Sequence, residues 1–278
     1  MEIPCVATDL PDCWVVGNGM LGGALADTLR LLGYRVLTLD NAVSAEVQGD
    51  AADCSVLLRA QRLLKPRVVF CCQATSGGDV VAYQHTYVAV VDALHAVVPH
   101  ARVVFCSSAS VYGDAAGVVN EQTPPLAPAE RARMLLEAES RVLLRQGVVL
   151  RLSPLYGKKR CEVLRRFLAG EPCLPGAAER WLNYLYEDDA VAALMTGMVL
   201  PPACYNVSGE SCRKSDLYAV LAEVTGVPVP SACGSVSKRG LSDRRLDCSR
   251  LMRDGWAPVM TLRRFAEQFS HCFLPDAS

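Results

Sequence analysis

Three glycines, Gly17, Gly19 and Gly22, stand at the spacing G-x-G-x-x-G between a short apolar run and a helical pattern. Gly17 permits a tight turn, Gly19 lets a backbone approach a pyrophosphate, and Gly22 lets a helix pack closely on a strand. The first turn of the following helix offers free N–H groups and a partial positive charge to phosphate oxygens. This pattern favours a dinucleotide site, although glycines also occur in turns that only connect a strand to a helix.

Asp40 completes the pattern, because it ends a second apolar run about 20 residues after the glycines. A carboxylate at this place accepts hydrogen bonds from ribose hydroxyls and repels a 2′-phosphate, so NAD is favoured over NADP. We therefore expect NAD as the cofactor. The predicted cofactor-binding residues of this segment are Gly17, Asn18, Gly19, Met20, Leu21, Gly22 and Asp40.

A serine-rich segment, Ser107-Ser108-Ala109-Ser110-Val111-Tyr112-Gly113, follows another apolar run and is the first candidate for catalysis. Hydride transfer needs a proton donor within hydrogen-bond reach of the reacting oxygen. Ser108 can hydrogen-bond a carbonyl or an alcohol, but its own pKa is too high for a base. Tyr112 is the nearest phenol in the sequence and is our candidate proton donor. Tyr87 is a second candidate, with helix packing as its alternative role.

Alternating strands and helices must position these residues. Strands are expected at 13–16, 35–40, 45–48, 68–72, 102–106 and 148–152, and helices at 24–32, 55–64, 80–97 and 129–145. Repeated units of this length predict an α/β fold with a doubly wound parallel (Rossmann) sheet and right-handed crossovers. Ligands bind outside the carboxyl ends of such strands, so the loops at 17–22, 74–78 and 107–113 are expected to line one crevice.

The second half of the chain is less regular. We expect helices at 161–168, 190–199, 215–225 and 261–273, and a late strand at 205–207. The predicted domains are a NAD-binding Rossmann domain over 1–157, rejoined by the strand near 203–207, and a small C-terminal substrate-binding lobe that takes most of 158–278.

Composition narrows the class of protein. The 278 residues are 51% hydrophobic, and 28 basic against 29 acidic residues leave a formal net charge of −1. No block of Lys and Arg residues stands out in the sequence, which argues against nucleic acid as the main partner. The 13 cysteines contain no C-x-x-C pair, so neither a disulfide framework nor a metal site is expected. The start, Met1-Glu2-Ile3-Pro4, lacks signal-peptide features, and no apolar stretch could cross a bilayer. We expect a soluble, cytoplasmic protein that binds no membrane.

Nearly the whole chain resembles the extended short-chain dehydrogenase/reductase family, of the NAD-dependent epimerase and dehydratase type that acts on nucleotide sugars. The resemblance rests on the glycine turn with Asp40, on 107–113, on 151–157 and on 183–189, where Tyr186 replaces the usual histidine. It implies an adenine-contacting acid at Asp50. The further cofactor contacts that it implies are Ala74, Ser107 and Pro154.

One departure from this family concerns catalysis. Its members use a Tyr-x-x-x-Lys pair, in which tyrosine is the acid/base and lysine lowers the tyrosine pKa. Here the spacing places Arg131 and Leu135 at those positions, and no tyrosine lies between Tyr112 and Tyr156. The chain therefore resembles an atypical branch. Arg131 is either a ligand for phosphate or carboxylate or a solvated helix arginine.

Other polar residues in the second half leave alternatives open. The resemblance implies substrate contacts at Arg180 and Asn183. Asp188 and Asp189 are either a carboxylate pair or, as we favour, acids that cap a helix. Glu121 either touches substrate or lies at the surface. The basic run Lys158-Lys159-Arg160 contacts a nucleotide diphosphate or is a solvated loop.

Two functions follow from these residues. The first is a NAD-dependent oxidoreductase or epimerase-like enzyme that acts on a nucleotide sugar or a related hydroxy/keto compound with a non-standard proton donor. The alternative is a non-catalytic NAD(P)-binding sensor or regulatory protein. In either case the expected partner is a small molecule. The resemblance also implies a homodimer through the helices at 80–97 and 129–145.

Overall fold

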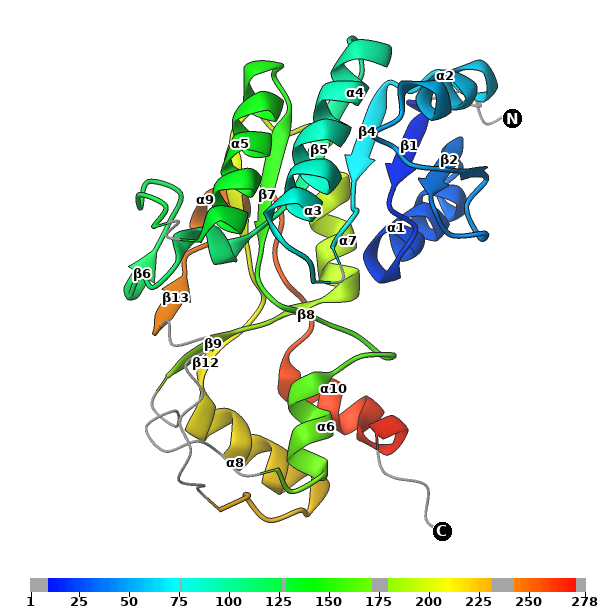
Figure 1. The fold of residues 1–278 in the computed structure, drawn as a ribbon. Helices are drawn as coiled ribbons and strands as arrows, with labels where there is room; N and C mark the ends of the chain where they lie inside the picture. The colour runs from blue at the N-terminus through cyan, green and yellow to red at the C-terminus, as the bar shows by residue number, and fades with distance from the viewer. Residues whose placement is uncertain (1–9, 76, 127–128, 172–179, 232–242, 274–278) are drawn as a thin grey trace, which may run out of the picture. The chain divides into compact units, whose positions relative to one another are not determined.

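The computed structural model describes residues 10–75, 77–126, 129–171, 180–231 and 243–273 (Figure 1). The chain contacts group it into two compact units. The first consists of Met1–Cys106, Glu137–Val149 and Pro201–Ala203. The second consists of Ser107–Leu136, Leu150–Leu200 and Cys204–Ser278. The described residues form one main sheet and three pairs of short strands.

That sheet has, among the described residues, the strand order β11-β7-β5-β4-β1-β2-β3. Its strands are β1 (Cys13–Val16), β2 (Val36–Asp40), β3 (Val47–Gln48), β4 (Val68–Cys71), β5 (Arg102–Ser108), β7 (Val148–Leu152) and β11 (Cys204–Val207). β1 pairs in parallel with both β2 and β4, and β4 pairs in parallel with β5. All four residues of β1 and of β4 are buried, as expected for central parallel strands. The predicted doubly wound parallel sheet is confirmed.

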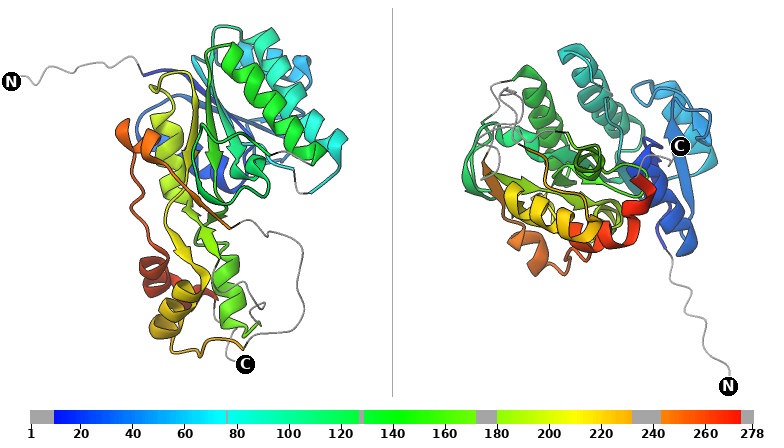
Figure 2. Two further views of the ribbon diagram at one scale, coloured as in Figure 1. Left: turned by 90° about the vertical axis from the view of Figure 1, so that its left-hand side faces the viewer. Right: turned by 90° about the horizontal axis from the view of Figure 1, so that it is seen from below.

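Helices connect these strands. They are α1 (Met20–Leu31), α2 (Cys54–Leu63), α3 (Val80–Tyr83), α4 (Val90–Val97) and α5 (Glu130–Leu144). A π-helical segment, Gln84–Ala89, joins α3 to α4, so the helix predicted at 80–97 consists of three pieces. α4 and α5 run side by side in both views of Figure 2. Arg141 of α5 donates to both carboxylate oxygens of Asp92, at 2.6 and 2.7 Å.

The second unit has a core of its own. Phe265 is fully buried and packs edge-on against Tyr156 at 5.0 Å between ring centroids. Its helices are α6 (Glu162–Leu168), α7 (Glu187–Thr196), α8 (Lys214–Thr225), α9 (Ser249–Arg253) and α10 (Leu262–Phe269). Its short strands are β6 (Gly117–Val119), β8 (Leu155–Tyr156), β9 (Trp181–Asn183), β10 (Leu185–Tyr186), β12 (Ser211–Arg213) and β13 (Arg244–Leu246). They pair as β10-β8, β12-β9 and β13-β6.

Three of the differences from the predicted boundaries concern candidate residues or the C-terminal helix. β5 continues through Ser107 and Ser108, which were expected in a loop. α7 begins at Glu187, so Asp188 and Asp189 lie inside its first turn and not before it. The helix predicted at 261–273 ends as an α-helix at Phe269 and continues as a 3₁₀ turn. Within the described part of the chain, no helix is long and apolar enough to cross a membrane.

Candidate cofactor and substrate sites

The three glycines of the turn between β1 and α1 have different surroundings. Gly17 has a φ of +91°, and a Cβ added there would lie 2.4 Å from the backbone nitrogen of Gln73. A Cβ on Gly22 would lie 1.8 Å from the carbonyl oxygen of Gly17. A Cβ on Gly19 would meet no atom within 4 Å. Chain packing therefore requires glycine at the first and third positions, whereas the space above Gly19 is open to a ligand.

The N-terminus of α1 has the properties of a phosphate site. Gly19 is the N-cap residue, no side chain caps the helix, and its first turn contains no acidic residue. Helix N-termini leave backbone N–H groups without intrahelical partners and bear a partial positive charge. The neighbouring Asn18 side chain donates to the Ser44 hydroxyl at 3.2 Å. Met20 is half-buried and Leu21 is buried, so these two residues anchor the helix.

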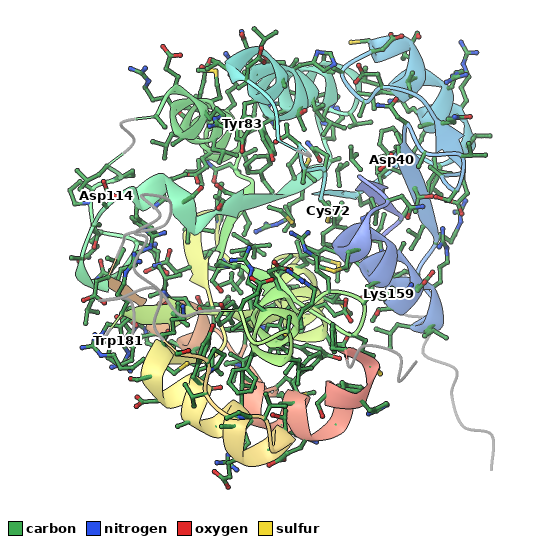
Figure 3. All side chains as sticks on the ribbon, turned by 60° about the horizontal axis from the view of Figure 1, so that its bottom comes forward. Asp40, Cys72, Tyr83, Asp114, Lys159 and Trp181 are labelled. Atoms are coloured by element: carbon green, nitrogen blue, oxygen red, sulfur yellow. The ribbon has the colours of Figure 1, made fainter. Side chains whose placement is uncertain are left out.

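Asp40 lies directly beside this turn. Its Oδ2 accepts a hydrogen bond from the Asn18 N–H at 2.6 Å, and its Oδ1 accepts one from the Ala42 N–H at 2.9 Å. Figure 3 labels Asp40 at the end of β2. A carboxylate has about four lone-pair sites, so acceptor capacity remains for two hydroxyl groups. The structure thus brings the predicted acid and the glycine turn together, as a ribose-binding role requires.

Asp50 has a partner that the sequence did not indicate. Its Oδ2 lies 2.6 Å from Nε2 of His85, and its Oδ1 accepts from the Ala52 N–H at 2.8 Å. His85 belongs to the π-helical segment, and a single histidine in a helix gives no sequence signal for such a pair. Ala74 follows β4 and is exposed. Both predicted cofactor residues are thus accessible within the first unit.

Ser107 and Ser108 are the last residues of β5. Ser107 is buried, whereas Ser108 is half-buried. The Ser108 hydroxyl oxygen accepts from the Ser110 N–H at 3.1 Å and thereby caps the 3₁₀ turn Ala109–Tyr112. Since this bond uses a lone pair, the hydroxyl proton stays available for donation to another group. This arrangement is suited to hydrogen bonding a substrate oxygen.

The surroundings of Tyr112 do not suit a catalytic proton donor, which must reach the substrate. It has no exposed surface, and its hydroxyl donates to Oδ1 of Asn206 at 2.8 Å and accepts from Nη1 of Arg151 at 3.0 Å. Burial raises the pKa of the phenol, and the nearby Arg151 charge opposes that rise. These contacts give Tyr112 a structural role within the second unit. Its catalytic role stays a prediction that the geometry does not support.

Tyr87 shows a similar pattern within the first unit. It is 7% exposed, and its hydroxyl accepts from the Thr75 N–H at 3.4 Å. Its ring packs edge-on against Phe105, with 6.2 Å between centroids. Burial raises its pKa despite the bond from Thr75. The helix-packing alternative describes these contacts well.

Arg131 and Leu135 stand where the family has its catalytic tyrosine and lysine, and neither can replace them as an acid/base pair. Arg131 lies on the exposed side of α5, and Leu135 is only 4% exposed. A leucine side chain has no group that hydrogen-bonds a ribose hydroxyl and no positive charge that would lower the pKa of a phenol. The structure of α5 is therefore consistent with a lost Tyr-x-x-x-Lys function.

The Asn183 side chain makes three hydrogen bonds within the second unit. Its Oδ1 accepts from the Ser211 hydroxyl and from the Leu246 N–H, both at 2.9 Å, while its Nδ2 donates to the Arg244 carbonyl at 2.8 Å. The side chain joins β9, β12 and β13, so its polar atoms serve the fold, where a substrate contact was expected. Arg180 directly precedes β9, and its carbonyl accepts from the Lys214 N–H.

Several other polar residues also have structural partners. Asp189 is buried, and its carboxylate accepts from the Val259 and Met260 N–H groups at 3.0 and 3.1 Å, whereas Asp188 is exposed. Glu121 accepts from the Asn206 N–H at 2.7 Å. The three residues of the basic run 158–160 are exposed. Pro154 is exposed as well, and its carbonyl accepts from the Leu185 N–H. Among the described residues, no group of three or more metal-binding side chains occurs.

Two arginines pack around Trp181, and the sequence did not predict this cluster. The guanidinium groups of Arg213 and Arg245 lie 4.5 and 5.7 Å from the indole centroid. Asp243 accepts from the Trp181 N–H at 2.9 Å and lies 3.5 Å from Arg213. Figure 3 labels Trp181 in this unit. The pairing of β9 with β12 brings Arg213 to Trp181, and the hydrogen bonds between Asn183 and β13 bring Arg245 there. No local motif could therefore predict the cluster.

Comparison with known proteins places the chain in a family. Residues 14–207 match the sequence model of the NAD dependent epimerase/dehydratase family. The chain belongs to this family, as the resemblance of its motifs implied. It is also 30% identical to protein YeeZ of Escherichia coli over 216 residues. This matched region covers 69% of this chain and 76% of YeeZ.

Solved structures show the same fold. UDP-glucose 4-epimerase of Thermotoga maritima, solved with UDP-glucose, superposes with a TM-score of 0.77 at 19% identity, over 94% of this chain and 98% of that chain. The Thermus thermophilus UDP-glucose 4-epimerase, in complex with NAD, gives 0.77 at 20% identity over the same shares. WbmG of Bordetella bronchiseptica, in complex with NAD and UDP, gives 0.79 at 18% identity over 95% of both chains.

Proposed function

We propose that this protein binds NAD at the turn between β1 and α1. The open space above Gly19, at an uncapped helix N-terminus, is the observation that carries this proposal. Backbone N–H groups there would hold the pyrophosphate, and Asp40 would accept from the adenosine ribose hydroxyls. The preference for NAD over NADP follows from the Asp40 charge. The NAD dependence of the family supports the same cofactor.

We propose further that the protein is an oxidoreductase or epimerase-like enzyme for a nucleotide sugar or a related hydroxy/keto compound. NAD accepts and returns hydride when bound. Ser108 would donate its hydroxyl proton to a substrate oxygen, because the bond from the Ser110 N–H occupies a lone pair and leaves that proton available. The guanidinium groups of Arg213 and Arg245 offer positive charge beside an aromatic ring, which suits a nucleotide diphosphate. The UDP ligands of the solved structures support that substrate class.

The second candidate function is NAD binding without turnover. The buried Leu135 and the fully engaged Tyr112 hydroxyl favour it, because neither position supplies a mobile proton. A protein of this kind would sense the cofactor and change its own shape or its binding of a partner. Membership of an atypical branch of the family stays a prediction in both cases.

An activity screen distinguishes the two functions. Purified protein is incubated with NAD or NADH and a panel of UDP-sugars and related keto compounds, and both nicotinamide absorbance and sugar products are followed. The enzyme proposal predicts slow turnover that Ser108→Ala reduces about 100-fold, whereas the matched variant Ser110→Ala keeps it. NAD binding with no product from any compound would instead support the sensor.

A further inference from the structure

The side chains of Cys72 and Cys106 contact each other next to the glycine turn. Cys71 of β4 is the register partner of Phe105 in β5, so the next residues along the two strands, Cys72 and Cys106, stand opposite each other. Their Sγ atoms are 3.7 Å apart, and both side chains are half-buried. Figure 3 labels Cys72, which directly follows β4. The two thiols thus share one face of the first unit's sheet, at its carboxyl edge.

The backbone geometry permits a disulfide here. Neighbouring strands are about 4.8 Å apart, and disulfides join Cα atoms separated by about 4.4–6.8 Å. Bond formation would shorten the sulfur–sulfur distance from 3.7 Å to about 2.05 Å. Rotation of the two side chains can supply most of this shift. Cys72 lies directly against the glycine turn, since its Cβ is 3.2 Å from the place of a Cβ on Gly22.

We propose that Cys72 and Cys106 form a reversible disulfide that changes the affinity of the adjacent turn for NAD. The oxidant is a low-molecular-weight disulfide such as oxidised glutathione. One protein thiolate attacks it, which forms a mixed disulfide and releases one glutathione thiolate. The second protein thiolate then attacks the mixed disulfide and releases the other glutathione. Two protein thiols are oxidised, one glutathione disulfide is reduced, and the two thiol protons pass to the leaving thiolates.

The chemistry of the pair sets the rate of this exchange. The hydrogen bond with Cys106 and burial together raise the pKa of Cys72. Since the thiolate is the nucleophile, exchange should quicken as the pH rises. Cys71, buried in the core, also has a raised pKa because of burial, and it faces away from this pair along the strand. The link to cofactor affinity rests on the proposed NAD site, but disulfide formation does not.

The test combines disulfide mapping with cofactor titration. The full-length protein is equilibrated in glutathione buffers of increasing oxidation, trapped with N-ethylmaleimide and digested without reduction. We expect a peptide that links Cys72 to Cys106, absent in Cys72→Ala and Cys106→Ala but retained in Cys54→Ala, which removes an exposed cysteine of α2. NADH affinity, measured on the oxidised and the reduced protein, should differ about fivefold or more.

Each outcome decides one part of the proposal. If Cys54 becomes glutathionylated while Cys72 and Cys106 remain thiols, the disulfide is overturned. If the linked peptide forms and both redox states bind NADH equally, the coupling is overturned. If the reduced protein binds no NADH, the proposed function fails, while mapping of wild-type protein still decides the disulfide. Because the mapping uses wild-type protein, an alanine variant that does not fold leaves the test intact.

Discussion

Gly17 and Gly19 are two residues apart, but substitution by alanine should affect stability at Gly17 and cofactor binding at Gly19. Gly17 has a positive φ and no room for a Cβ, whereas Gly19 has ordinary extended backbone angles and open space. We expect Gly17→Ala to lower the free energy of unfolding by about 2 kcal/mol or more. Gly19→Ala should cost less than about 1 kcal/mol and weaken NADH binding instead. Chemical denaturation and calorimetric titration of both variants measure the two effects. Equal loss of stability in both would show that the whole turn is purely structural.

Glu46 gives the first unit a defined pH dependence. Although burial alone would raise its pKa, hydrogen bonds from Thr38 and the charge of Arg30 lower it below the ordinary value. A lowered folded-state pKa means that the stabilisation is present at neutral pH and is lost as the pH falls through that pKa. With 45% of the side chain exposed, Glu46→Gln should cost about 0.5–1 kcal/mol at pH 7. The difference from wild type should vanish in acid. A difference that persists at low pH would contradict this account.

At the scale of elements, Asp189 joins α7 to the segment before α10. Its carboxylate accepts two backbone N–H groups that would otherwise be unpaired. Asp189→Ala should therefore cost about 2–3 kcal/mol, while the exposed neighbour variant Asp188→Ala should cost less than about 1 kcal/mol. Thermal unfolding compares them directly. A carboxylate pair with a catalytic role would instead show loss of activity in both variants at unchanged stability.

The elements differ in how far the sequence predicts them. β1 and β7 were predicted to the residue, because each is an apolar run bounded by turn signals. Strands β9, β12 and β13 have only three residues each. They are joined by the hydrogen bonds of the Asn183 side chain, which no local sequence pattern encodes. The early start of α7 was missed because acidic residues suit a helix cap and a first turn equally well. The glycine turn was predictable since its geometry is local, whereas the engagement of Tyr112 needs residues distant in the chain.

At the scale of the whole molecule, we predict a homodimer through α4 and α5. The exposed face of α5 includes Leu144, whose side chain is 78% exposed. Light scattering should give about twice the chain mass of 30.0 kDa. Leu144→Glu should reduce this to one chain mass, because burial of a charge without a partner is unfavourable. The matched variant Leu31→Glu changes a leucine of α1 that is 87% exposed and should leave the mass unchanged. A monomeric wild-type protein would contradict the prediction.

Calorimetric titration of the reduced protein with NADH and NADPH tests the central claim most directly. The account predicts micromolar binding of NADH and weaker binding of NADPH, because the Asp40 carboxylate repels a 2′-phosphate. Asp40→Ala should weaken NADH binding about 10-fold and narrow the difference between the two cofactors. Binding of neither cofactor, with the protein folded, would contradict the account, since the open turn at Gly19 would then have no ligand to explain it.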